Sequence, residues 1–126
     1  MKAMKKLLIF EDDVLNQNLY QTLFKDEYQT AIYSSFEKFI EDNLDWDFDA
    51  VIMDLSLKGN HDGIQIMQYL RSNEKFKNLP IICITAHAFL KDKENCMRNG
   101  ADAYIAKPCT KKTIFSALEK CITERK

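Results

Sequence analysis

Five short apolar runs alternate with amphipathic stretches along the chain, and this alternation constrains the fold more than any other feature of the sequence. The runs are KKLLIF at 5–10, YQTAIY at 28–33, DAVIMD at 49–54, PIICIT at 80–85 and DAYIA at 102–106. Short apolar runs are typical of strands that are covered on both faces, although YQTAIY shows this less clearly than the others. The alternation predicts an α/β fold with a parallel five-stranded sheet and helices on both faces.

The amphipathic stretches between the runs carry apolar residues at helical spacing. In the first stretch, 14–25, Leu15, Leu19 and Leu23 recur at every fourth residue, which places them on one stripe of a helix. An S-x-x-E pattern at 34–37 is a capping box and predicts the start of the second helix.

The other three helices are predicted from apolar positions and from helix stop signals. The third helix follows a loop closed by Gly63 and carries Ile64, Met67 and Leu70. The fourth runs from about His87 to Asn99 and ends before Gly100. The fifth starts near Thr110 and has four apolar residues on one face: Ile114, Phe115, Leu118 and Ile122. Glycine is a favoured residue just after a helix, which supports the end of the fourth helix.

Size and composition indicate one domain whose function depends on a local site. The 126 residues, 46% of them hydrophobic, suffice for a single core, so we expect residues 1–126 to form one domain without an output domain. The net charge is −1, with 29% charged residues. Such a balance does not favour sequence-independent binding to nucleic acid or to an anionic membrane surface.

The sequence shows no export or membrane signal. The apolar stretch after the first lysines ends after four residues, and no run approaches the roughly 18 apolar residues of a membrane span. We therefore expect a cytoplasmic protein. Its four cysteines lack a Cys-x-x-Cys pattern, so the expectation is free thiols rather than a zinc site or a redox pair.

Acidic residues follow two of the predicted strands. Glu11 and Asp12 come after the first run, Asp54 ends the third, Thr85 ends the fourth and Lys107 follows the fifth. Right-handed crossovers place all strand-to-helix loops of such a sheet at its carboxyl edge. Ligands of open α/β sheets bind at that edge, where the strand order reverses.

This predicted cluster has the chemistry of a site for a hard cation. Three carboxylates in one cleft repel one another, so ionising all of them is unfavourable unless a cation lies between them. The cluster offers oxygen donors and neither histidine nor thiol, which favours Mg²⁺ over zinc. Lys107 adds a positive charge suited to a phosphate group.

Five strings carry a family resemblance. IFEDD, VIMDLSL, HDGIQ, ITAHA and DAYIAKP stand in the order and spacing of the receiver domains of two-component response regulators, the CheY-like family. The resemblance covers essentially the whole chain. It implies a flavodoxin-like (βα)5 fold with the strand order 2-1-3-4-5.

The resemblance also implies roles for the acidic residues. Asp54 resembles the phosphoacceptor, which takes a phosphoryl group from a phosphohistidine of a sensor kinase or a histidine phosphotransfer protein. Asp12 resembles a direct Mg²⁺ ligand, Glu11 a ligand that acts through water, and Ser56 the residue that contributes a backbone carbonyl. Asp13 lies outside this set and is expected to cap the first helix.

Further positions resemble the phosphate-binding and switch residues of the family. Lys107, Thr85 and the backbone N–H of Ala86 would hold phosphate oxygens, and the bond from Lys107 to Pro108 is expected to be cis. Thr85 and Tyr104 are expected to move on phosphorylation. Their movement would change the surface of the fourth helix, fifth strand and fifth helix, which a downstream protein recognises.

Each of these residues also has a plainer interpretation. Asp54 alone could cap a turn, Lys107 could be a solvated surface lysine, Thr85 could bond its own backbone, and Tyr104 could cover the sheet edge.

Three function classes follow from these interpretations. The first is a phosphorylatable receiver that is no enzyme beyond its own phosphorylation and dephosphorylation. The second is an interaction module that has lost phosphorylation, and the third is a phosphatase, whose D-x-D-x-T pattern is absent from DLSLK. We expect a stand-alone monomer or weak homodimer, and the alternative is a receiver excised from a hybrid histidine kinase.

Overall fold

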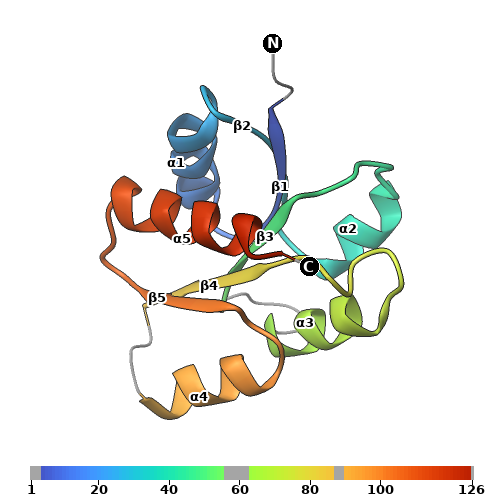
Figure 1. Cartoon of the computed structure of the whole chain (residues 1–126). Coiled ribbons are helices and arrows are strands. Elements are labelled where there is room, and N and C mark those ends of the chain that lie inside the picture. Colours follow the sequence, from blue (N-terminus) through green and yellow to red (C-terminus); the bar gives the residue numbers. More distant parts are fainter. Residues whose placement is uncertain (1–3, 56–62, 87–89, 126) are drawn as a thin grey trace.

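The fold is a parallel sheet of five strands with helices on both faces (Figure 1). The computed structural model describes residues 4–55, 63–86 and 90–125. The strands are β1 (Lys5–Phe10), β2 (Tyr28–Tyr33), β3 (Ala50–Asp54), β4 (Ile81–Thr85) and β5 (Ala103–Ala106). The helices are α1 (Val14–Phe24), α2 (Phe36–Asp42), α3 (Gly63–Ser72), α4 (Leu90–Arg98) and α5 (Lys111–Thr123). The sheet order is β2-β1-β3-β4-β5, which confirms the predicted fold class and the order implied by the resemblance.

The three central strands account for the continuous apolar runs in the sequence. β1 pairs with both β2 and β3, and all residues of β3 and β4 are buried. A strand that is covered on both faces needs apolar side chains at every position, so it does not show alternation. No helix in the described ranges has the length and apolar character needed to span a membrane.

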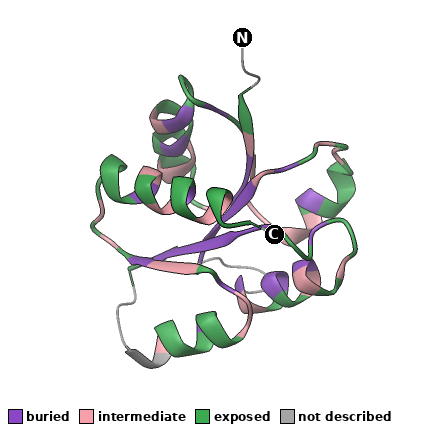
Figure 2. Cartoon of the chain, viewed as in Figure 1, coloured by how far each residue is buried: buried purple, intermediate pink, exposed green. Residues whose placement is uncertain are grey.

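Two apolar clusters lie on opposite faces of the sheet (Figures 1 and 2). On the face of α1 and α5, the buried cluster contains Leu7, Ile9, Tyr20, Phe24, Ile52, Ile82, Ile84, Ile114 and Leu118. On the face of α2, α3 and α4, it contains Leu8, Phe10, Phe39, Val51, Met53, Ile66, Met67, Leu70, Cys83 and Cys96. Burial of this apolar area on both faces is the main stabilising term of the fold.

Of the predicted leucine stripe of α1, Leu23 packs against the core, whereas Leu15 and Leu19 point to solvent. The side chains of Leu15 and Leu19 are 74% and 66% exposed, whereas Tyr20 and Phe24 are buried. A spacing of four residues advances about 40° beyond a full turn at each step, so such a stripe winds around the helix. The two aromatic rings offer more apolar area, and the helix buries them instead.

The predicted helix starts are confirmed at α1 and α5 and wrong by one residue at α2. The Asp13 carboxylate accepts the N–H of Leu15 at 2.8 Å, and the Thr110 hydroxyl accepts the N–H of Thr113 at 3.2 Å. At α2, the capping residue is Ser35 rather than the serine before it. The Ser35 hydroxyl accepts the N–H of Lys38 at 3.2 Å. In a capping box at 34–37, the Ser34 hydroxyl would instead accept the N–H of Glu37.

The ends of α4 and the apolar face of α5 follow the sequence closely. The predicted start of α4 at about His87 lies outside the described residues, whereas its end at Arg98, two residues before Gly100, agrees with the prediction. Ile114 and Leu118 of α5 are buried against the sheet, as their spacing predicts. The α-helical crossovers therefore return each strand to the same direction and bring the strand ends to one edge.

Candidate functional site at the carboxyl edge of the sheet

The ends of four strands bring polar side chains together at the carboxyl edge. Glu11 follows β1, Asp54 ends β3, Thr85 ends β4 and Lys107 follows β5. Among the described residues, the buried polar ones are Glu11, Asp54 and Thr85, each at most 1% exposed. The strand order reverses between β1 and β3, where open α/β sheets bind their ligands. The site therefore lies where the fold class predicts a ligand.

Lys107 joins the two buried carboxylates. Its Nζ lies 2.7 Å from Oδ2 of Asp54 and 3.9 Å from Oε1 of Glu11. Its backbone N–H donates to the carbonyl of Thr85 at 2.8 Å, which fixes the chain as it leaves β5. Burial lowers the pKa of Lys107, but the hydrogen bond to Asp54 and the charges of Asp54 and Glu11 outweigh it and raise that pKa overall. The ammonium group is therefore charged and held against Asp54.

Glu11 is buried with one carboxylate oxygen unsatisfied. Its N–H donates to the carbonyl of Tyr33 at 3.0 Å, and its carbonyl accepts Nε2 of Gln17 at 2.6 Å. Its Oε2 accepts the N–H of Asp13 at 3.3 Å, while no donor in the described parts of the chain reaches Oε1. Burial, together with the Asp54 carboxylate, raises the pKa of Glu11 from 4.5 to about 8. Within the described residues, Oε1 of Glu11 thus has an ion-pair contact with Lys107 at 3.9 Å but no hydrogen-bond donor.

The other predicted site residues lie around this centre. Asp12 is half-buried next to Glu11, and the exposed Ala86 directly follows Thr85 after the end of β4. Tyr104 is half-buried on β5 and packs on the cluster that faces α3 and α4. Ser56 lies outside the described residues.

Two further details of the site bear on the sequence predictions. The peptide bond from Lys107 to Pro108 is cis, as the resemblance implies. The contribution of Gln17, whose side chain holds the backbone of the acidic pair, was missed from the sequence. Gln17 is one of several polar residues on α1, and no spacing or composition signal separates it from the others.

The donor set fits a hard cation that keeps several water ligands. The oxygens of Glu11, Asp12 and Asp54 come from the ends of two adjacent strands, and Oε1 of Glu11 lacks a hydrogen-bond donor. Within the described ranges, no group of three or more His, Cys, Asp or Glu residues is placed so that it could hold a metal ion. Mg²⁺ is usually bound through only one or two carboxylates, with water in the remaining positions, so a Mg²⁺ site does not require three such side chains.

Comparisons with known proteins agree on one family. The profile of the response regulator receiver domain matches residues 7–119. The chain is 30% identical over 105 residues to the polar-differentiation response regulator DivK of Brucella ovis, which covers 82% of this chain and 85% of DivK.

Solved structures show the same fold. The receiver domain of the sensor histidine kinase PA1611 from Pseudomonas aeruginosa, described with a magnesium ion coordinated in its active-site cleft, superposes with a TM-score of 0.85 and 27% identity. The match covers 97% of this chain and 100% of that domain. The chemotaxis protein CheY4 of Vibrio cholerae has a TM-score of 0.85 at 20% identity, covers 94% of this chain and 99% of its own, and shows the fold alone.

Proposed function

Because this chain belongs to the response regulator receiver domain family of two-component signalling, we propose that it is a switch that accepts a phosphoryl group on Asp54 with Mg²⁺. Members of this family are generally signalling domains rather than enzymes, and they act with histidine kinases. The observation that carries the proposal is the buried Asp54 carboxylate, held at 2.7 Å by Lys107 beside the unsatisfied oxygen of Glu11.

The proposed reaction is a transfer from a phosphohistidine to Asp54. A carboxylate oxygen of Asp54 attacks the phosphorus atom, the P–N bond breaks, and the imidazole leaves with the electron pair of that bond and takes up a proton. Lys107 lies where it can neutralise one phosphate oxygen, and the Thr85 hydroxyl and the Ala86 N–H can donate to another. This transfer depends mainly on positioning and on charge neutralisation.

Mg²⁺ would be held by Asp12 and Asp54 directly, by Glu11 through water, and by the backbone carbonyl of Ser56. The part assigned to Ser56 rests on the family resemblance alone. The bound cation supplies charge neutralisation for the transferred phosphoryl group. The unsatisfied Oε1 of Glu11 supports this assignment, because a water ligand of the cation would give it a donor.

The exposed face of α1 supports docking of a protein that carries the phosphohistidine. Val14, Leu15 and Leu19 are each at least 66% exposed, and α1 contains no charged residue. This apolar face begins two residues after Asp12 and therefore borders the site. A sensor kinase or histidine phosphotransfer protein that reaches Asp54 would cover it and bury its apolar area.

The proposed output is a change at α4, β5 and α5. Thr85 and Tyr104 would move after phosphorylation, and a downstream protein that prefers the resulting conformation would read the signal. A cytoplasmic location, a single receiver domain over 1–126 without an output domain, and a monomer or weak homodimer belong to this proposal. A receiver excised from a hybrid histidine kinase is the alternative arrangement.

Intact-mass measurement after incubation with acetyl phosphate tests this function. We expect the wild type to gain the mass of HPO₃ in Mg²⁺ and not in EDTA, because the charge of the phosphoryl group must be neutralised. Asp54→Asn should gain none under either condition. As a matched control, Asp49→Asn changes a half-buried aspartate at the opposite end of β3 and should still take up the group.

An unchanged wild-type mass, under conditions that phosphorylate a control receiver, would overturn the proposal. It would favour the second candidate class, an interaction module in which the acidic cluster no longer accepts phosphate.

A further inference from the structure

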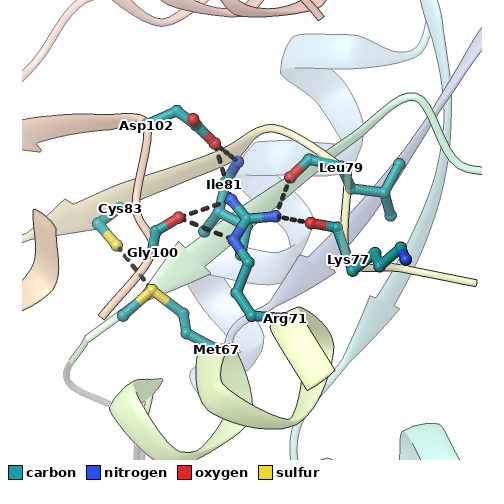
Figure 3. Close-up of polar contacts among 8 residues, drawn as sticks. All are labelled: Met67, Arg71, Lys77, Leu79, Ile81, Cys83, Gly100 and Asp102. Carbon is teal, nitrogen blue, oxygen red and sulfur yellow. Dashed lines mark hydrogen bonds and ion pairs between the residues drawn. The ribbon is translucent and has the colours of Figure 1, made fainter. Parts of the chain in front are cut away.

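One arginine of α3 binds the turn that directly follows α4 (Figure 3). Arg71, in the last turn of α3, donates to the carbonyl of Gly100 through Nε at 3.1 Å and Nη2 at 2.6 Å. Its Nη1 donates to the carbonyls of Lys77 and Leu79, at 2.9 and 2.6 Å, and its Nη2 also donates to Asp102 at 2.9 Å. All five N–H groups of the guanidinium are therefore used.

Two more contacts extend this clamp, by which we mean Arg71 and the groups it binds. The Asp102 carboxylate also accepts the N–H of Ile81, so the clamp reaches the first residue of β4. One turn earlier on α3, Nε2 of Gln68 donates to Oδ1 of Asn99 at 2.9 Å. The end of α4 is thus fixed to α3 and to the sheet at once.

Gly100 is the residue that permits the close approach of the clamp. Its φ of 113° lies in the left-handed region, where a side chain is strained. A Cβ at this position would lie 2.9 Å from Cγ and Nε of Arg71. The Arg71 side chain can therefore pack against this turn only because residue 100 has no side chain.

The rest of α4 is held more weakly. From Asp92 to Arg98, where its side chains are described, only Cys96 is buried. A cavity of about 150 Å³ lies beside α4, with Asp92, Asn95 and Cys96 of the helix in its lining. Thr85, at the end of β4, also lines it. Space for movement therefore exists next to the residue at which the phosphoryl signal is expected to arrive.

We propose that the Arg71 clamp is the fixed end of the output switch, and that α4 tilts about Gly100 when Asp54 is phosphorylated. This inference rests on the proposed function. Moving the whole helix would displace Gly100, which directly follows its last turn, and break the two hydrogen bonds between Gly100 and Arg71. A tilt of the N-terminal end of α4 keeps these two bonds and uses the cavity beside Thr85. Charged hydrogen bonds are stronger than neutral ones, so the tilt is the less costly movement.

Hydrogen exchange of α4, with and without beryllofluoride and Mg²⁺ as a phosphoryl mimic, tests the clamp. In the wild type we expect the mimic to change exchange in residues 90–95 by about tenfold or more and to leave 99–101 nearly unchanged. Arg71→Lys keeps the charge and loses the planar fork. It should speed exchange at 99–101 by about tenfold with or without the mimic.

The N–H groups of Asn99, Gly100 and Ala101, all bonded to carbonyls of α4, are suitable reporters. Arg98→Lys is the control, since it makes the same exchange of side chain at an exposed residue in the last turn of α4, next to the reporters, and should behave as the wild type. Thermal unfolding of each variant verifies that it is folded.

Unchanged exchange at 99–101 in Arg71→Lys would overturn the clamp, and so would an equal response to the mimic at both ends of the wild-type helix. These two results differ from the result expected if the chain is not phosphorylated at all. In that case the wild type would take up no phosphoryl group from acetyl phosphate, whereas exchange in the untreated Arg71→Lys variant would still report on the clamp.

Discussion

At the scale of single residues, one positive charge serves two buried carboxylates. Lys107 Nζ lies 2.7 Å from Asp54 and 3.9 Å from Glu11, so its positive charge stabilises the Asp54 carboxylate more than the Glu11 carboxylate. Glu11 is left buried beside a second carboxylate, and these two effects raise its pKa to about 8. The fold therefore opposes ionisation of Glu11 until a further cation enters the site.

The raised pKa of Glu11 predicts a stability that falls as the pH rises. The folded state binds this proton more tightly than the unfolded state, whose pKa is near 4.5. The contribution of Glu11 is complete below pH 4.5 and is lost progressively up to about pH 8. Urea denaturation in EDTA, at several pH values in this window, should show a falling free energy of unfolding.

Comparison with Glu11→Gln isolates this effect, because glutamine does not titrate. The variant should show a smaller fall in unfolding free energy over the same range, whereas the exposed control Glu41→Gln should retain the wild-type fall. Equal pH dependence in the wild type and Glu11→Gln would show that the proton is not held by Glu11.

At the scale of elements, α1 has one buried and one exposed apolar face. Phe24 is fully buried and stacks on Phe115 with ring centroids 5.4 Å apart, whereas Leu19 is 66% exposed. Phe24→Ala should lower the free energy of unfolding by about 3–5 kcal/mol, because it removes core contacts and leaves a cavity. Leu19→Ala should change it by less than about 0.5 kcal/mol. Urea denaturation of the two variants measures both values.

The Leu19→Ala variant also tests the proposed docking role of the exposed face. Leu19→Ala should accept phosphate from acetyl phosphate at the wild-type rate, but more slowly from a phosphorylated histidine kinase that transfers to the wild type. Thr22→Ala, at an exposed position of the same helix, is the matched control. If Leu19→Ala slowed phosphorylation equally from acetyl phosphate and from the kinase, Leu19 would affect the phosphoryl transfer itself and not the docking of the kinase.

The sequence predicts strand ends better than helix faces. Glu11, Asp54 and Lys107 were placed together correctly because parallel strands direct their carboxyl ends to one edge whatever the details of packing. The orientation of α1 was wrong because spacing alone does not decide between the leucines and the aromatic pair Tyr20 and Phe24. Their contact with the sheet and with α5 decides it, and that contact depends on tertiary structure.

The Arg71 clamp could not be predicted for a similar reason. A basic residue in the last turn of a helix is commonly explained by the helix dipole. Its partners are carbonyls that any sequence would supply, and only the fold brings them within reach. Gly100 gives a signal for a helix end, but none for the arginine that lies against it.

At the scale of the whole molecule, the two edges of the sheet carry different polar groups. The carboxyl edge carries the acidic site, while Arg71 ties the opposite edge to the last turns of α3 and α4. Thr85 and Cys96 lie between these two regions, beside the cavity under α4. The proposed movement of Thr85 would therefore take place directly beside α4.

Binding of Mg²⁺ should stabilise the whole molecule, and more strongly at pH 8 than at pH 6. At the lower pH the cation must displace the proton of Glu11, which weakens its apparent affinity. A concentration 100 times the dissociation constant should raise the unfolding free energy by about 2.7 kcal/mol. Thermal unfolding with Mg²⁺ and with EDTA at both pH values measures this. A midpoint that does not respond to Mg²⁺ at either pH would contradict a cation site at Glu11, Asp12 and Asp54.

The most direct measurement is chemical identification of the residue that carries the phosphoryl group. Borohydride reduces an aspartyl phosphate to homoserine, so treatment after incubation with acetyl phosphate and Mg²⁺ marks the acceptor, which peptide mass spectrometry then locates. We predict homoserine at position 54 in the Mg²⁺ sample and none there in EDTA. Homoserine at position 12 or 13, or at no position in a sample that had gained the phosphoryl mass, would contradict Asp54 as the acceptor.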